Sequence, residues 1–278
     1  GNIGYQMSGL LPRRKPGVSG FVALPGWEPE NDWQGFVSPE DLPRSLNPEC
    51  GFFVTANQNM NEFGNAAATN IGMGPYRSDR IAQMLEENDH LTRQDMYRIQ
   101  QDLYSTQAAE FMKILAPLLP DTPAAGILKN WNFQYDAGSQ GAYLFEQFYR
   151  HLYREVFGRN GVGEDTVDFL ENHTGVFIDF YINFDRILLS GQSAWFGGRT
   201  REELFGQAAE KALAFSPKKW GDTRQVMLNN IVFAGKLPKF LGFDRGPVTL
   251  AGGRATPNQG QIYESGGRQT TFAPSYRM

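Results

Sequence analysis

The spacing of apolar residues changes twice along this sequence, and the order of those changes limits the folds that the chain can adopt. Residues 1–60 are rich in Pro and Gly and contain two short apolar runs, 3–11 and 51–56, which have the length of strands. From Tyr76 the apolar residues recur at helical spacing, and after Trp220 short apolar runs between Gly and Pro return. Strands, then helices, then strands, without a regular βαβ alternation, predict an α+β fold.

The same changes predict three parts in this chain of 278 residues. We expect a strand-and-loop part at 1–75, a mainly helical region at 76–216 and a return to strands and loops at 217–278. A length of this size fits one elaborated domain or two closely packed parts.

Capping signals and apolar periodicity predict the helices of the middle region. Thr92 with Asp95, and Thr200 with Glu203, form the pairs that commonly begin a helix. For 167–189 a strand stays open as the alternative, because the segment is rich in β-branched and aromatic residues. We expect five helices, at about 76–85, from Thr92 toward 115, at 142–157, at 167–189 and from Thr200 to 213. We expect a loop at 126–140.

Composition excludes several classes of function. The 26 basic and 30 acidic residues give a formal charge of −4, which is not the charge of a nucleic-acid-binding surface. The most apolar stretch, 175–189, is interrupted by charged residues and is too short to cross a membrane. We therefore expect neither a nucleic-acid partner nor a membrane partner.

Cysteine and histidine give little sign of a reactive or metal site. Cys50 is the single cysteine, which excludes an internal disulfide, and a lone cysteine beside a strand is more often a small buried apolar residue than a nucleophile. His90, His151 and His173 are far apart and match no common metal-ligand spacing, so structural roles are favoured.

Carboxamide side chains gather directly after the strand-like residues 51–53. They are Asn57, Gln58, Asn59 and Asn61. An Asn amide can donate a hydrogen bond to an oxyanion without a change of protonation. The alternative is an Asn-rich turn in which the side chains bond nearby backbone, and composition alone favours that turn.

An ordered set of short motifs runs through nearly the whole chain. The motifs are Asn-Ile-Gly-Tyr at 2–5, Leu-Pro-Gly-Trp at 24–27, Asn-Pro at 47–48, Gly-Phe-Phe-Val-Thr-Ala-Asn at 51–57, Tyr-Arg-Ser-Asp-Arg-Ile at 76–81, Leu-Thr at 91–92, Trp-Gly-Asp at 220–222, Gly-Gly at 252–253 and Pro-Ser-Tyr-Arg-Met at 274–278. In this order they resemble the β chain of the penicillin acylase (penicillin amidase) family.

The resemblance implies an N-terminal-nucleophile hydrolase with an αββα core, formed by self-cleavage of a precursor, that hydrolyses the amide bond of acylated small molecules. In this family a Ser that begins the β chain is the nucleophile and its own α-amine is the base. Because this chain begins with Gly1, the resemblance implies an internal fragment of a β chain that lacks the nucleophile. Its expected partners are a small acyl-amide substrate, the remainder of the β chain and the α chain.

Two residues of this chain match site residues of the family. The oxyanion-hole Asn falls on Asn57, with Asn59 as the alternative if the alignment shifts, and the Arg near the acyl-binding cleft falls on Arg80. An Arg at this place in a helix can equally tie neighbouring loops together. Calcium is often held between the chains of the family, but the Asp that follows the oxyanion Asn has no counterpart in 66–70, so we expect no cofactor or metal here.

These considerations lead to two hypotheses of different classes. In the first, the chain is part of an amidohydrolase that acts on a β-lactam side chain, an acyl-homoserine lactone or another acyl amide, and it is inactive alone. Such enzymes are commonly periplasmic or secreted. In the second, the chain is a non-catalytic helical scaffold or binding domain.

Overall fold

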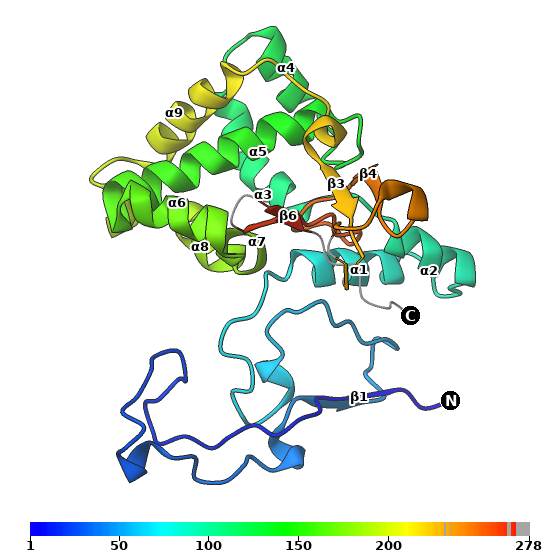
Figure 1. Ribbon diagram of the computed structural model, residues 1–278, viewed down its shortest axis with the longest axis vertical. Coiled ribbons are helices and arrows are strands. Elements are labelled where there is room, and N and C mark those ends of the chain that lie inside the picture. The colour runs from blue at the N-terminus through cyan, green and yellow to red at the C-terminus, as the bar shows by residue number, and fades with distance from the viewer. Residues whose placement is uncertain (231, 234, 266–267, 271–278) are drawn as a thin grey trace. The chain divides into compact units, whose positions relative to one another are not determined.

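The computed structural model describes residues 1–230, 232–233, 235–265 and 268–270. The motif at 274–278 lies outside the described residues. The chain forms two compact units, Gly1–Pro75 and Tyr76–Met278, which are traced in Figure 1 and taken separately below.

The first unit is built mainly from loops around one short antiparallel pair. Strand β1 (Gly4–Gln6) pairs with β2 (Arg44–Leu46), with Tyr5 opposite Ser45. Side chains hold many of the loops, as when the Asn47 side-chain oxygen accepts a hydrogen bond from the Ile3 amide at 3.0 Å. The buried apolar side chains of this unit are Leu42, Pro43, Ala56 and Met60. With so little apolar burial, hydrogen bonds from side chains to backbone define much of its conformation.

The strand expected at 51–56 is not present, and the one expected at 3–11 is reduced to β1. The side chain of Gln58 takes up backbone groups that a β-strand here would need for its hydrogen bonds to a neighbouring strand. It accepts from the Ala56 amide at 2.6 Å and donates to the Val54 carbonyl at 2.8 Å. The Phe53 ring stacks on the ring of Tyr5 at 4.6 Å between centroids. The segment is therefore fixed by local bonds and ring packing rather than by a sheet.

The second unit begins with the helical region. Its α-helices are α1 (Tyr76–Glu86), α2 (Arg93–Gln100), α3 (Thr106–Leu115), α4 (Pro123–Lys129), α5 (Gln140–Tyr153), α6 (Glu164–His173), α7 (Val176–Asp179), α8 (Tyr181–Leu188) and α9 (Arg201–Leu213). Both predicted capping boxes are confirmed, Thr92 with Asp95 at the start of α2 and Thr200 with Glu203 at the start of α9. The segment 167–189 contains no strand, but the single helix expected there is divided among α6, α7 and α8, with breaks at 174–175 and 180.

Three of the other expected helix boundaries are wrong. The helix expected from Thr92 to 115 is divided into α2 and α3, because Ser105 caps a new helix by accepting from the Ala108 amide at 3.1 Å. The loop expected at 126–140 begins as α4, which has Thr122 as its N-cap and Pro at its first position. Helix α5 ends at Tyr153, and the chain continues from Arg154 to Val162 as a π-helical segment.

The core of the second unit is centred on α5. The predicted apolar stripe of this helix is confirmed, since Leu144, Phe148, Leu152 and Val156 are at most 1% exposed. Burying a side chain of this size is worth about 1.5–3 kcal/mol. At the first turn of α5 the Trp131 indole lies against Gly141, where an added Cβ would stand 2.3 Å from the indole Cγ. Only a residue without a side chain fits beneath this ring.

Two short antiparallel pairs complete the second unit. Strand β3 (Gln225–Leu228) pairs with β4 (Arg245–Thr249), and β5 (Tyr263–Ser265) pairs with β6 (Arg268–Thr270). Within the described residues no sheet has more than two strands. The predicted order of strands, helices and strands is confirmed, and the fold is α+β.

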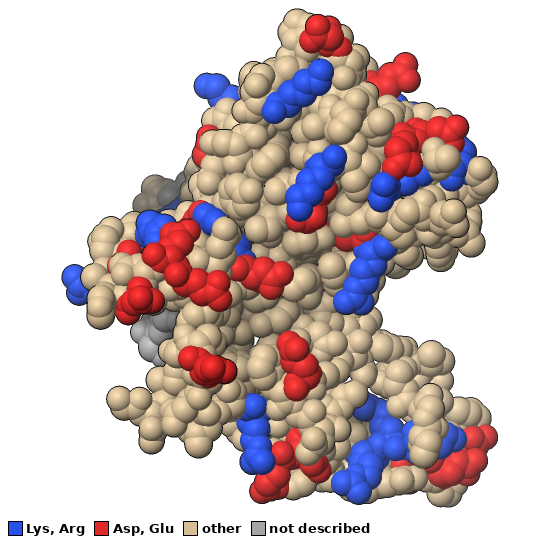
Figure 2. All heavy atoms as spheres, turned by 180° about the vertical axis from the view of Figure 1, so that it is seen from behind, with Lys and Arg blue, Asp and Glu red and all other residues tan. Residues whose placement is uncertain are grey.

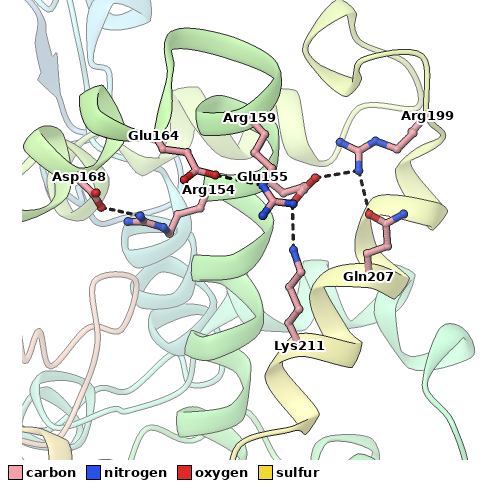
Figure 3. A network of polar contacts seen from close by, with 8 residues as sticks. All are labelled: Arg154, Glu155, Arg159, Glu164, Asp168, Arg199, Gln207 and Lys211. Atoms are coloured by element: carbon pink, nitrogen blue, oxygen red, sulfur yellow. Dashed lines mark hydrogen bonds and ion pairs between the residues drawn. The ribbon is translucent and has the colours of Figure 1, made fainter.

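A charged network joins the π-helical segment to α9 (Figure 3). Glu155 accepts from Arg199 at 2.9 Å and from Lys211 at 3.0 Å, and its carboxylate lies 3.4 Å from Arg159. Burial alone would raise the pKa of Glu155, but the hydrogen bonds from Lys211 and Arg199 outweigh it and hold this pKa below its ordinary value. The network therefore fixes the helix pair through one carboxylate that is ionised at neutral pH.

On the face shown in Figure 2, basic and acidic side chains are interspersed rather than gathered by sign. Such a distribution does not create the positive field that attracts nucleic acid. Among the described residues no helix is both long and apolar enough to cross a bilayer.

Candidate functional site

The predicted oxyanion donor, Asn57, stands exposed in the first unit in a left-handed backbone conformation. Its φ is 68°, a value that Asn adopts far more readily than most residues. Its carbonyl accepts a hydrogen bond from the Met73 amide at 2.8 Å. The side chains on either side of the segment, Ala56 and Met60, are 6% and 4% exposed. Asn57 is therefore held at the surface between two buried anchors.

The neighbouring carboxamides are used by nearby backbone. Gln58 bonds Val54 and Ala56, as described above, and the Asn59 side-chain oxygen accepts from the Asn61 amide at 2.9 Å. Asn61 in turn bonds both the amide and the carbonyl of Thr69 at 2.8 Å. The interpretation as an Asn-rich turn thus describes Gln58, Asn59 and Asn61, and it makes Asn59 a poor substitute for Asn57.

A second loop packs against this turn and restricts its movement. An added Cβ at Gly72 would stand 2.7 Å from the Asn59 amide nitrogen, so the two backbones approach as closely as glycine allows. The bond from Met73 to the Asn57 carbonyl lies next to this contact. The backbone that carries Asn57 is therefore fixed on both sides.

Arg80 lies on α1 in the second unit, and its guanidinium is occupied by neighbours. Its Nε and Nη2 donate to the two carboxylate oxygens of Asp102 at 2.8 and 3.3 Å, and its Nη1 donates to the side chain of Gln83 at 2.8 Å. The same group lies 4.8 Å from the ring centroid of Tyr104. These contacts tie α1 to the loop between α2 and α3, the structural role that an Arg in such a place can have.

A buried carboxyl that the sequence analysis did not assign to any site lies in the second unit. Asp185 on α8 has no exposed surface, and its two oxygens accept from Gln107 at 2.7 Å and from the Tyr149 hydroxyl at 2.8 Å. Burial raises the pKa of this carboxyl to about 7, although both hydrogen bonds act to lower it. The sequence signal was an Asp within the most apolar stretch of the chain.

Arg77, three residues before Arg80, is another buried group that sequence reasoning missed. Arg77 is 5% exposed, and its charge acts to lower the pKa of the Tyr181 phenol, which burial raises. Its charge also acts on Asp179, whose carboxylate accepts from the Tyr263 hydroxyl at 2.8 Å. The motif at 76–81 contains both arginines, so the sequence offered Arg77 as well as Arg80.

The residues considered for metal or thiol chemistry show no such arrangement. Among the described residues no group of three or more His, Cys, Asp or Glu could hold a metal ion. In 66–70 the amide and the carbonyl of Thr69 are both bonded to Asn61. The absence of calcium from the working protein stays a prediction.

The expectation that Cys50 is buried is wrong. Cys50 is exposed, and its thiol donates to the Phe52 carbonyl at 3.2 Å, because the segment beside it is a loop and not a strand. Of the histidines, His90 is exposed, while His151 and His173 lie 5.7 and 5.4 Å from the rings of Phe215 and Phe169.

Comparison with known proteins places these residues in a family. The family model described as penicillin amidase matches residues 1–278. The chain belongs to the penicillin amidase family. The similarity that the motifs indicated is thereby confirmed over the full sequence.

Individual relatives agree with this assignment. Over 169 residues the chain is 31% identical to "Penicillin acylase 2 proenzyme" of Pseudomonas sp. (strain SE83), a match that covers 58% of this chain and 22% of the relative. It is 29% identical over 175 residues to "Acyl-homoserine lactone acylase QuiP" of Pseudomonas fluorescens (strain Pf-5), covering 56% of this chain and 21% of that protein. The matched part is therefore about a fifth of the length of these relatives.

A solved structure shows that the likeness extends to the fold. The thermostable penicillin G acylase from Alcaligenes faecalis superimposes with a TM-score of 0.57 at 20% identity, covering 77% of this chain and 44% of that chain. At this identity the comparison supports the penicillin amidase fold and does not by itself decide the substrate.

Proposed function

We propose that this member of the penicillin amidase family is part of an amidohydrolase that cleaves the amide bond of an acylated small molecule. The nucleophile we propose is an N-terminal Ser of the catalytic chain that precedes Gly1. The matches to a penicillin acylase and to acyl-homoserine lactone acylases support this class of reaction. The substrate class we propose is correspondingly an acylated β-lactam nucleus, an acyl-homoserine lactone or another acyl amide.

In the proposed reaction the Ser oxygen attacks the carbonyl carbon while the α-amine of the same Ser takes its proton. The carbonyl oxygen then carries the negative charge of a tetrahedral intermediate, and the side-chain N–H of Asn57 donates to it. Collapse of the intermediate breaks the C–N bond, and the amine leaves with the proton. Water then attacks the acyl-enzyme and releases the acid.

The observation that carries this proposal is the placement of Asn57. It is exposed, its backbone is left-handed, and the residues Ala56 and Met60 that flank it are buried. An oxyanion donor must be held in place before the reaction, because its benefit depends on not having to reorganise. A left-handed backbone at such a residue is also typical of positions where function sets the conformation.

For Arg80 we propose a positioning role. Its bonds to Asp102 and Gln83 fix α1, which the family resemblance associates with the acyl-binding cleft. We also propose, on the resemblance alone, that the working protein contains the rest of the β chain and an α chain and that it acts in the periplasm or outside the cell.

The test is a set of substitutions in the full-length protein that separates the amide of Asn57 from its backbone conformation. Asn57→Gly keeps the φ of 68° without strain and removes only the side chain. We expect this change to lower kcat by about 10²–10³-fold, the usual loss for one oxyanion donor, with a smaller effect on KM. Asn57→Asp has nearly the same shape but lacks the N–H, and it is expected to lose as much.

Asn59→Ala is the matched control, because its side-chain oxygen bonds the Asn61 amide within the same turn. We expect it to cost about 1 kcal/mol of stability and to leave kcat nearly unchanged. If Asn57→Gly retained full kcat on an acyl-nitroanilide substrate, Asn57 would be a turn residue only. If the full-length wild-type protein showed no hydrolysis of any acyl amide, the alternative of a non-catalytic scaffold would be favoured.

A further inference from the structure

Two arginines in the second unit carry guanidinium nitrogens that no group of the described residues satisfies. Nε and Nη2 of Arg254 and Nε of Arg224 are buried and have no hydrogen-bond partner in this part of the chain. Both side chains line a cavity of about 40 Å³ together with Glu146, Ile178, Trp220 and Gln261. Buried guanidinium donors are normally satisfied, so three orphaned nitrogens around one cavity require an explanation.

The arginines are held in place by aromatic rings. The guanidinium of Arg254 lies 4.1 Å from the ring centroid of Tyr149, and that of Arg224 lies 4.8 Å from the ring centroid of Trp220. These contacts fix the planes of both groups at the cavity. The site is therefore preorganised by packing and does not depend on two mobile surface chains.

The charges around the cavity do not balance. Glu146 is the carboxylate that lines it, and its oxygens already accept from Arg254 Nη1 at 2.8 Å and from the Tyr135 hydroxyl at 2.8 Å. Among the described residues that line the cavity, one carboxylate thus faces two guanidinium groups. Burial raises the pKa of the Tyr135 and Tyr149 phenols well above their ordinary value, so neither supplies negative charge.

Two other carboxyls of the second unit, those of Asp185 and Asp179, are bonded to other partners. Asp185 bonds Gln107 and Tyr149, and Asp179 bonds Tyr263 and lies in the field of Arg77. In agreement with an excess of positive charge, burial and the charge of Arg254 lower the pKa of Arg224 to about 10, although Glu146 opposes them.

We propose that this cavity binds one monatomic monoanion of the size of chloride between Arg224 and Arg254. A space of about 40 Å³ admits a single ion of this kind or one to about three waters, and it is too small for an acyl group or an amino acid. A halide accepts several N–H donors at once from different directions, which matches donors that come from two separate guanidinium groups. The ion links Arg224, which directly precedes β3, to Arg254 in the segment 253–262, so its effect is on the stability of this part of the second unit.

Bromide replaces chloride in such a site and is directly visible by anomalous scattering. In crystals of the full-length wild-type protein grown or soaked in sodium bromide, we expect an anomalous peak within hydrogen-bond distance of Arg224 Nε and Arg254 Nη2. Water density without an anomalous peak would overturn the proposal, and this measurement needs no variant.

Solution measurements supply the second test. Thermal unfolding of the full-length protein is followed as sodium chloride replaces sodium gluconate at constant ionic strength, which separates halide binding from general screening. We expect a saturable rise in Tm with chloride, and Arg224→Gln should raise the half-saturating concentration at least tenfold.

Arg159→Gln is the matched control, since Arg159 is an arginine with a side chain 60% exposed whose partners are Glu155 and Glu164. Its chloride response is expected to equal that of the wild type. Equal Tm values in chloride and gluconate for the wild type, or an unchanged response in Arg224→Gln, would refute the site.

Discussion

Replacing Asp185 by Asn should change how the stability of the protein depends on pH. The carboxyl of Asp185 is fully buried between α3, α5 and α8, and burial raises its pKa from 3.8 to about 7. Between these two values the folded protein keeps a proton that the unfolded chain releases. The free energy of unfolding contributed by this residue therefore falls as pH rises from about 4 to about 7, and it is constant above that range.

The size of the effect follows from the two pKa values. They differ by about three pH units, and each unit corresponds to about 1.4 kcal/mol, so ionisation of Asp185 removes about 4 kcal/mol of stability by pH 8. Asn cannot ionise, and its amide occupies nearly the same volume. Relative to wild type, Asp185→Asn should gain about 4 kcal/mol between pH 4 and pH 8, whatever its starting difference at pH 4.

Urea unfolding of the two proteins at half-unit steps from pH 4 to pH 8 measures this gain. Using the difference between variant and wild type cancels the contribution of the other titrating groups, including Glu155, whose pKa is lowered in the folded state. If the Asp185→Asn difference were flat across this pH range, Asp185 would not be the protonated buried group that the structure indicates.

Two further predictions concern the proposed enzyme. Arg80→Gln in the full-length protein should cost about 2–3 kcal/mol of stability, because it leaves the largely buried Asp102 without its guanidinium partner. We expect kcat to change less than twofold. A large loss of kcat with intact stability would instead place Arg80 in contact with the substrate. If the nucleophile is the proposed Ser before Gly1, the 278-residue chain alone should not hydrolyse an acyl-nitroanilide, because catalytic groups act as a unit, and measurable turnover by this chain would contradict that proposal.

Local signals in the sequence predicted structure well wherever the interaction itself is local. The boxes of Thr92 with Asp95 and Thr200 with Glu203 begin helices because both partners lie within one turn. Thr122 followed by Pro123 is an equally local helix start, and it was missed because a loop was expected at 126–140. The break between α2 and α3 also carries a local signal that was missed, the Ser105 cap on the Ala108 amide, whereas the bond that holds Asp102 in this break comes from Arg80, twenty-two positions earlier.

The candidate site was predictable only in part, because some of its features are local in the sequence and others depend on residues far apart in the chain. The clustering of carboxamides pointed to Asn57, but the exposure of Asn57 depends on the burial of Ala56 and Met60, which the folded unit decides. The cavity between Arg224 and Arg254 joins residues from 146 to 262, so no spacing in the sequence could reveal it.

The contact between Trp131 and Gly141 has a consequence for the evolution of the chain. The indole occupies the space that any side chain at 141 would need, so neither position can change freely without the other. A larger residue at 141 becomes acceptable only after 131 has become smaller, and a smaller residue at 131 leaves a void that a larger residue at 141 can fill. Substitutions at these two sites are therefore expected to be accepted as a pair, so that related sequences keep both Trp and Gly or have lost both.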